Sequence, residues 1–373
     1  MTATVRKCSH PTCTIASISD PLVTEHGQRL DHAEIAYETW GKLSPARDNV
    51  ILIIHALTGD AHAASHHEGD RPGWFEGMIG PGKALDTNRF HVICTNLLGG
   101  CSGSTGPRSI NPLTGQRYNL SFPALTVRDL VRAQARLLDK LGIRRLHTVI
   151  GGSLGGMQAL EWAIMYPDRV ERIVPIASSA HFSPQGIAYN EVQRRAILMD
   201  PNFNDGNYDE DKGPAQGLAL ARMLGMITYQ SDELMSTRFG RSTDAKYNDW
   251  PEFQTRFDVE GYLHYQGDKL VGRFDANSYL YLTRAMDSHD IGWKREGYKN
   301  ALQLIETPTL GIGISSDILF PAKYTIDFVE RLSQIGRPAE YREIQSPHGH
   351  DAFLKDFERL DSIVRDFIHQ DGI

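Results

Sequence analysis

Residues 148–159 constrain the fold of this chain more than any other segment. They read Thr-Val-Ile-Gly-Gly-Ser-Leu-Gly-Gly-Met-Gln-Ala, so a short β-prone run leads directly into a Gly-x-Ser-x-Gly turn around Ser153. A strand that turns sharply into a helix crowds its backbone, and glycine fits there because it has no Cβ. The turn is expected to expose the Ser153 hydroxyl beside the first N–H groups of the next helix, which lack intrahelical acceptors. The segment therefore predicts a serine nucleophile close to donors for an oxyanion.

Apolar runs elsewhere predict the strands of a sheet. We expect strands at residues 32–39, 49–55, 89–95, 172–177, 309–314 and 339–344. The run at 50–54 is apolar throughout, as in a central parallel strand covered on both faces. Residues 125–142 predict a helix that Thr126 caps, with Asp129 three residues on, and that Gly142 ends. This alternation indicates a mostly parallel, doubly wound α/β sheet, and the serine turn specifies the α/β-hydrolase fold.

Residues 181–300 have a different character, with polar turns, helix-like stretches and no convincing buried strand. We therefore predict a core formed by residues 1–180 and 301–373, interrupted by a mostly helical insertion at residues 181–300. In this fold an insertion here lies over the carboxyl ends of the strands and acts as a lid. The last helix is expected to run from near Phe353 to about Phe367.

Bulk properties exclude several classes of protein. The 373 residues carry a net charge of −7, which argues against binding to nucleic acid, because a phosphate backbone demands a basic face. The longest clearly apolar run is far too short to span a membrane, and the first ten residues contain no secretory signal. The cysteines do not suggest a disulfide framework; they are Cys8, Cys13, Cys94 and Cys101. We expect a reduced, cytoplasmic protein, with a mobile terminus rather than a metal clip at Cys8 and Cys13.

A serine nucleophile needs a base, and the base needs a carboxylate that orients it. In α/β-hydrolases the chain order is Ser, then Asp or Glu, then His. Asp317 follows the strand expected at 309–314, and both His348 and His350 follow the strand at 339–344. We predict Asp317 as the acid and prefer His350 to His348 as the base. The oxyanion donors are expected to be the backbone N–H groups of Leu57 and Leu154.

Two further segments invite a site interpretation. The first contains several possible metal ligands, namely His55, Asp60, His62, His66, His67 and Asp70. No pair of them has helical ligand spacing backed by a carboxylate, so we predict no metal site. The second is the Gly-rich loop at residues 96–107, which lacks the Gly-Lys-Ser/Thr ending of a phosphate-binding loop. We expect this loop to form a wall of the active site, with a plain loop as the alternative.

Over nearly its whole length the chain resembles the homoserine O-acetyltransferases of the α/β-hydrolase type, enzymes of methionine biosynthesis. The matching segments are residues 55–62, 73–82, 96–107, 151–156, 274–280 and 349–354. The resemblance implies that acetyl-CoA acylates Ser153 and that homoserine then accepts the acyl group, with His350 as base. It also implies substrate contacts from Arg222 and Asp351, no permanently bound cofactor, and a homodimer. A guanidinium and a carboxylate suit the two charges of homoserine.

The acyl donor and the type of reaction leave alternatives open. Members of the family that resemble succinyltransferases tend to carry an arginine directly after the catalytic aspartate. Here Asp317 is followed by the apolar residues Ile318, Leu319 and Phe320, which favours acetyl. A homoserine O-succinyltransferase, a serine esterase or thioesterase, and a non-catalytic binding protein remain the alternatives. The transferase and the hydrolase differ only in whether an alcohol or water reaches the acyl-enzyme.

Overall fold

The computed structural model describes residues 10–209, 211–243 and 256–369. An eight-stranded sheet forms its centre, in the order β1-β4-β6-β5-β7-β8-β9-β10. The strands are β1 (Thr12–Ala16), β4 (Ala33–Trp40), β5 (Val50–Ile54), β6 (His91–Thr95), β7 (Thr148–Gly152), β8 (Ile173–Ile176), β9 (Thr309–Ile314) and β10 (Ala339–Ile344). Only β4 pairs antiparallel, with β1 and with β6, and the other pairs in this sheet are parallel. The mostly parallel sheet predicted from the sequence is confirmed. Two short strands, β2 (Leu22–Val23) and β3 (Arg29–Leu30), pair separately.

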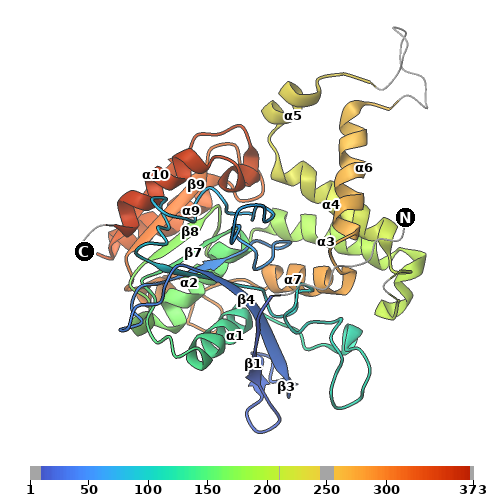
Figure 1. Ribbon diagram of the computed structural model, residues 1–373. Coiled ribbons are helices and arrows are strands. Elements are labelled where there is room, and N and C mark those ends of the chain that lie inside the picture. Colours follow the sequence, from blue (N-terminus) through green and yellow to red (C-terminus); the bar gives the residue numbers. More distant parts are fainter. Residues whose placement is uncertain (1–9, 210, 244–255, 370–373) are drawn as a thin grey trace.

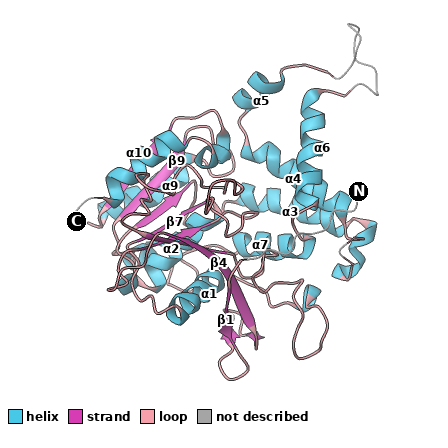
Figure 2. Cartoon of the chain, in the orientation of Figure 1, coloured by secondary structure: helices cyan, strands magenta, loops and turns pink. Residues whose placement is uncertain are grey.

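Helices cover both faces of the sheet, as Figure 2 shows. Side chains of β5 alternate between the faces: Val50, Leu52 and Ile54 join one hydrophobic cluster, whereas Ile51 and Ile53 join the other. The first cluster packs under α1 (Val127–Lys140), α2 (Leu154–Met165) and α9 (Ala322–Gln334). The second packs under α10 (Phe357–Ile368). A strand buried on both faces needs apolar residues at every position, which explains the continuous run in the sequence.

Between β8 and β9 the described chain forms helices. They are α3 (Pro184–Leu198), α4 (Ala215–Tyr229), α5 (Asp232–Phe239), α6 (Asp258–Val271), α7 (Ala276–Asp287) and α8 (Tyr298–Gln303). Figure 1 shows α3, α4, α6 and α7 together beside the sheet, with α5 projecting outward. Short 3₁₀ helices complete the elements: η1 (Asn119–Ser121), η2 (Pro167–Arg169), η3 (Pro201–Gly206) and η4 (Gly349–Leu354). No helix in the described part of the chain is long and apolar enough to cross a membrane.

The predicted helix cap on α1 is confirmed. The Thr126 side chain accepts a hydrogen bond from the Asp129 N–H, and the Asp129 carboxylate accepts one from the Thr126 N–H. Such a reciprocal pair satisfies two N–H groups that the first turn leaves without intrahelical acceptors. Helix α1 is thereby fixed at its start, against the same face of the sheet as α2.

Two local predictions were wrong. Residues Gly349–Leu354 form η4, and α10 begins only at Phe357, because Lys355 and Asp356 leave helical backbone angles. The amino-terminal segment is not a free terminus where it is described: Cys13 lies in β1, where it pairs with Ile35 of β4. Cys8 lies outside the described residues.

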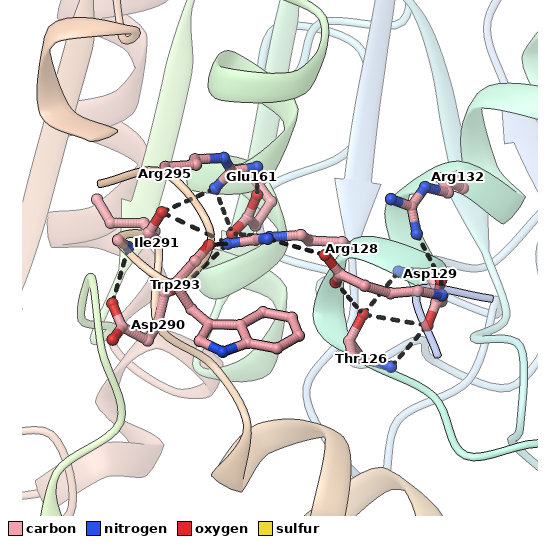
Figure 3. Close-up of polar contacts among 11 residues, drawn as sticks. Thr126, Arg128, Asp129, Arg132, Glu161, Asp290, Ile291, Trp293 and Arg295 are labelled. Atoms are coloured by element: carbon pink, nitrogen blue, oxygen red, sulfur yellow. Dashed lines mark hydrogen bonds and ion pairs between the residues drawn. The ribbon is translucent and has the colours of Figure 1, made fainter. Parts of the chain in front are cut away.

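A buried ion-pair network holds α2 in place (Figure 3). The Glu161 carboxylate on α2, 1% exposed, accepts hydrogen bonds from Arg128 of α1 (3.2 Å) and from Arg295 (2.7 Å). Arg128 also donates to the carbonyl oxygen of Trp293 at 2.7 Å. Removing one partner of such a buried pair typically costs about 3–5 kcal/mol, because the other charge stays buried. The network therefore joins the helix that follows Ser153 to α1 and to the segment before α8.

Candidate active site

Ser153 occupies a strained turn between β7 and α2. Its backbone has φ 59° and ψ −122°, a conformation that side-chain-bearing residues rarely adopt. The turn needs its glycines: a Cβ on Gly155 would overlap the carbonyl oxygen of Ile54. The Ser153 N–H donates to the Ile176 carbonyl oxygen of β8 at 2.9 Å, which ties the turn to the neighbouring strand. The strand–turn–helix geometry predicted from residues 148–159 is confirmed.

Asp317 and His350 form a short hydrogen bond within the protein. The Nδ1 atom of His350, on η4, lies 2.6 Å from Oδ2 of Asp317, which follows β9. The other oxygen, Oδ1, accepts hydrogen bonds from the N–H groups of Leu319 (2.9 Å) and Phe320 (2.8 Å). Because the carboxylate accepts at Nδ1, Nδ1 carries the proton, and Nε2 of the neutral ring is left as the basic nitrogen.

The surroundings of His350 tune its basicity. Burial disfavours the imidazolium, but the Asp317 and Asp351 carboxylates outweigh this and raise the pKa of His350. Phe320 stacks on the imidazole at 5.2 Å, and Phe353 meets it edge-on at 5.6 Å. The ring is thus held in one orientation by a carboxylate and two aromatic side chains.

His348, the other histidine of this loop, has a different partner. Its Nδ1 lies 2.9 Å from the Asp356 carboxylate, just before α10. It does not line the cavity that Ser153 and His350 share, at least among the residues that the structure describes. The geometry therefore associates His350, rather than His348, with Ser153 and Asp317.

Ser153 and His350 line one cavity of about 400 Å³. Residues of the loop after β5 and of helices in the insertion line it. The insertion contributes Asn190, Gln193, Arg222, Tyr229, Lys269, Arg273 and Met286. Of these, only Arg222 was singled out in the sequence, and only through the family resemblance. The others carry no local motif that would mark them.

Arg222 and Asp351 bring opposite charges to the same cavity. Arg222 lies over the Tyr229 ring at 5.4 Å, and its Nη1 is 3.5 Å from the Thr58 hydroxyl. Its buried Nε has no hydrogen-bond partner among the described residues. Burial raises the pKa of Asp351, and the nearby Lys355, His350 and Arg222 oppose this shift. A small molecule with one anionic and one cationic group would complement these walls.

The two predicted oxyanion donors lie in the loop after β5 and at the start of α2. Leu57 lies in the loop after β5 and lines the cavity. Leu154 is the first residue of α2, directly after Ser153. An N–H group in the first turn of a helix has no intrahelical acceptor, so the Leu154 N–H can donate to an oxyanion.

The Gly-rich loop at residues 96–107 does not line this cavity, so its predicted role as a wall was wrong. Instead, the loop forms hydrogen bonds with the segment after β5, which does line the cavity. The Asn96 side chain accepts a hydrogen bond from the Ala61 N–H at 2.7 Å, and the Leu97 N–H donates to His55 Nε2 at 3.3 Å.

Comparison with known proteins identifies the family. A sequence model of the alpha/beta hydrolase fold matches residues 49–357. The homoserine O-acetyltransferase of Symbiobacterium thermophilum is 56% identical over 359 residues, which cover 95% of this chain and 94% of that protein. The chain belongs to the homoserine O-acetyltransferase family. The member of this family from Carboxydothermus hydrogenoformans is 50% identical over 94% of each chain.

Solved structures agree with the family and extend the comparison. The crystal structure of homoserine O-acetyltransferase from Bacillus anthracis superposes with a TM-score of 0.89 at 32% identity, covering 96% of this chain and 98% of that one. Esterase E22 superposes with a TM-score of 0.88 at 29% identity, over 96% of this chain and 100% of its own. The homoserine O-acetyltransferase family thus shares its fold with an esterase, which is less identical to this chain than the three transferases named above.

Proposed function

We propose that this chain transfers the acetyl group of acetyl-CoA to the γ-hydroxyl of L-homoserine, giving O-acetyl-L-homoserine for methionine biosynthesis. One observation carries the proposal: Ser153 and the Asp317-bound His350 share a cavity with the oppositely charged Arg222 and Asp351. The first pair suits acyl transfer, and the second suits a zwitterionic acceptor. Membership of the family supports the same activity.

The first half-reaction forms an acyl-enzyme on Ser153. His350 Nε2 takes the proton from Ser153 Oγ as the oxygen attacks the thioester carbonyl carbon. The negative charge on the carbonyl oxygen is stabilised by the N–H groups of Leu57 and Leu154. The carbon–sulfur bond breaks, the CoA sulfur takes the proton from His350, and CoA leaves.

The second half-reaction runs the same steps with homoserine. His350 takes the proton of the γ-hydroxyl, and that oxygen attacks the ester carbon on Ser153. Collapse of the intermediate breaks the bond to Ser153, whose oxygen recovers the proton from His350. Asp317 holds the imidazole in the required tautomer and stabilises its charged form in both steps.

Replacing Arg222 or Asp351 separates acceptor binding from acylation. We expect Arg222→Ala and Asp351→Asn to raise KM for homoserine by about 10- to 100-fold, as loss of a charge-assisted hydrogen bond does. Acylation of Ser153 by acetyl-CoA should change less, because it does not involve Arg222 and involves Asp351 only through the charge that this carboxylate places near His350. Arg195→Ala, an exposed position on α3, is the matched control. Rapid-mixing kinetics of each half-reaction give the readout, and equal losses in both halves would contradict the assignment.

Acetyl is favoured over succinyl by the apolar residues that follow Asp317. Leu319 lines the cavity and carries no charge that could meet a second carboxylate. The relatives named above are acetyltransferases. Esterase E22, with a similar fold, keeps hydrolysis as the second candidate function.

Thiol release followed with a chromogenic reagent tests the proposal. Acetyl-CoA and succinyl-CoA are each supplied with and without L-homoserine. We expect release from acetyl-CoA that depends on homoserine, and O-acetylhomoserine as the product by mass spectrometry. Release from succinyl-CoA alone would correct the donor. Thiol release at the same rate with and without homoserine would instead identify the protein as a thioesterase.

We propose that residues 1–180 and 301–373 form the core and that the insertion at residues 181–300 forms a lid over this cavity. We also propose that the protein is a cytoplasmic homodimer and has no permanently bound cofactor. Support for the dimer comes from exposed apolar side chains on α4 and on the two helices that pack against it: Leu220 and Ile227 on α4, Val192 on α3, and Tyr265 on α6. Light scattering of the purified chain tests the oligomeric state.

A further inference from the structure

A cluster of nitrogen and oxygen donors lies outside the catalytic residues. His66 Nε2 is 2.8 Å and His62 Nδ1 is 3.0 Å from the same oxygen, Oε2, of Glu38 on β4. One donor atom from each of these three residues lies within 4.8 Å of the other two. Glu38 and His62 are buried, whereas the His66 side chain is 39% exposed and keeps the cluster open to solvent.

The two ring nitrogens of His62 have different partners. Its Nε2 lies 2.8 Å from the carbonyl oxygen of Arg71, which only accepts, so Nε2 carries a proton. In the neutral ring, Nδ1 then presents a lone pair toward the Glu38 carboxylate at 3.0 Å. Nδ1 is therefore the nitrogen of His62 that a cation bound to Glu38 would meet.

We propose that Glu38, His62 and His66 bind a divalent transition-metal ion, with Zn²⁺ as the best match. Imidazole nitrogen and carboxylate oxygen are common zinc ligands. Bonds of about 2.0–2.1 Å in a tetrahedron place neighbouring ligand atoms roughly 3.3 Å apart. The two spacings between a histidine nitrogen and Glu38 Oε2, 2.8 and 3.0 Å, are slightly shorter than this, and one donor atom from each of the three residues lies within 4.8 Å of the others. Water completes the coordination on the exposed side.

The surroundings of the three residues resemble the support that metal ligands usually have. The Arg71 carbonyl oxygen fixes the tautomer in which Nδ1 of His62 faces the site, as outer-shell acceptors do for ligating histidines. Trp40 stacks on the His66 ring at 5.0 Å with an interplanar angle of 6°. His10 Nδ1 lies 2.5 Å from the other Glu38 oxygen, Oε1. The two histidine nitrogens thus face the same carboxylate oxygen of Glu38.

The position of the site gives the ion a structural consequence. His62 and Arg71 line the cavity that holds Ser153. A metal ion would tie the segment between them to β4 and stiffen that wall of the cavity. The inference does not depend on which acyl group or acceptor the protein uses, because it concerns the cluster alone.

Metal titration of the full chain tests the proposal. After chelator treatment, calorimetry with Zn²⁺ is expected to give one equivalent bound per chain. Co²⁺ should give visible absorption bands of a tetrahedral nitrogen–oxygen site. Glu38→Gln and His66→Ala should each weaken Zn²⁺ binding by at least about 10- to 100-fold.

The neighbouring His67 provides the matched control. It is exposed, its Nδ1 lies 3.0 Å from the Glu68 carbonyl oxygen, and it is not among the three proposed ligands. His67→Ala should bind Zn²⁺ like the unaltered chain. Melting temperatures without metal verify that each variant folds. Binding well below one equivalent, or equal binding by His66→Ala, would overturn the proposal and leave the cluster as an ion pair between Glu38 and protonated histidines.

Discussion

Ser153→Ala is expected to abolish formation of the acyl-enzyme. With acetyl-CoA the unaltered chain should gain the mass of one acetyl group, and the variant should gain none. The reason is that Ser153 supplies the oxygen that forms the ester, and no other cavity-lining residue that the structure describes lies in the turn between β7 and α2. Loss of a serine nucleophile lowers kcat by up to about 10⁶-fold. Intact-protein mass spectrometry after rapid acid quench makes the measurement.

The control for this variant must separate chemistry from folding. Alanine meets the same positive φ of 59° as serine does, so the turn should persist and the melting temperature should change little. Ser17→Ala, at an exposed position, is the matched serine variant and should be acetylated normally. An acetyl adduct on Ser153→Ala would show that another residue is the nucleophile.

His350→Ala is expected to lose far more activity than His348→Ala. Removing His350 takes away the base bound to Asp317 and should lower kcat by about 10³- to 10⁶-fold. His348 hydrogen-bonds to Asp356 away from the cavity, so its removal should cost only a few-fold through local packing. Initial rates of homoserine-dependent thiol release, at saturating substrates, give the comparison.

The variant that loses more activity identifies which histidine is the catalytic base. Both residues lie on the same loop, so non-specific damage to that loop should affect both variants alike. Circular dichroism and melting temperatures of the two proteins should agree with the unaltered chain. A greater loss in His348→Ala would show that the base was assigned to the wrong histidine.

Local sequence patterns predicted most of the core. The glycines on either side of Ser153 indicate the crowded junction between a strand and a helix. Thr126 and Asp129, three residues apart, indicate the cap at the start of α1. The continuous apolar run of β5 reflects burial on both faces, which is itself a property of a central parallel strand. These features are determined by interactions within a few residues, so they can be read from the sequence. The junction before α10 is local too, but the backbone break at Lys355 and Asp356 has no strong sequence signal.

The site depends on contacts between distant segments, which the sequence does not specify by spacing. The sequence offered both His348 and His350, and only the fold shows which of them meets Asp317 and which meets Asp356. Arg222 reaches the same cavity from a helix of the insertion, and family resemblance alone had marked it.

The loop that contains His62 and His66 is a second case in which a distant segment supplies the partner. From sequence, its histidines lacked a carboxylate at ligand spacing, so no metal site was predicted. The structure brings Glu38 from β4 against His62 and His66, across 24 and 28 residues of chain. The sequence by itself determined the α/β core, the serine turn and the helix cap, because neighbouring residues make those contacts. Only the tertiary structure decided the partners of the histidines and the walls of the cavity, because strand pairing and helix packing bring those residues together.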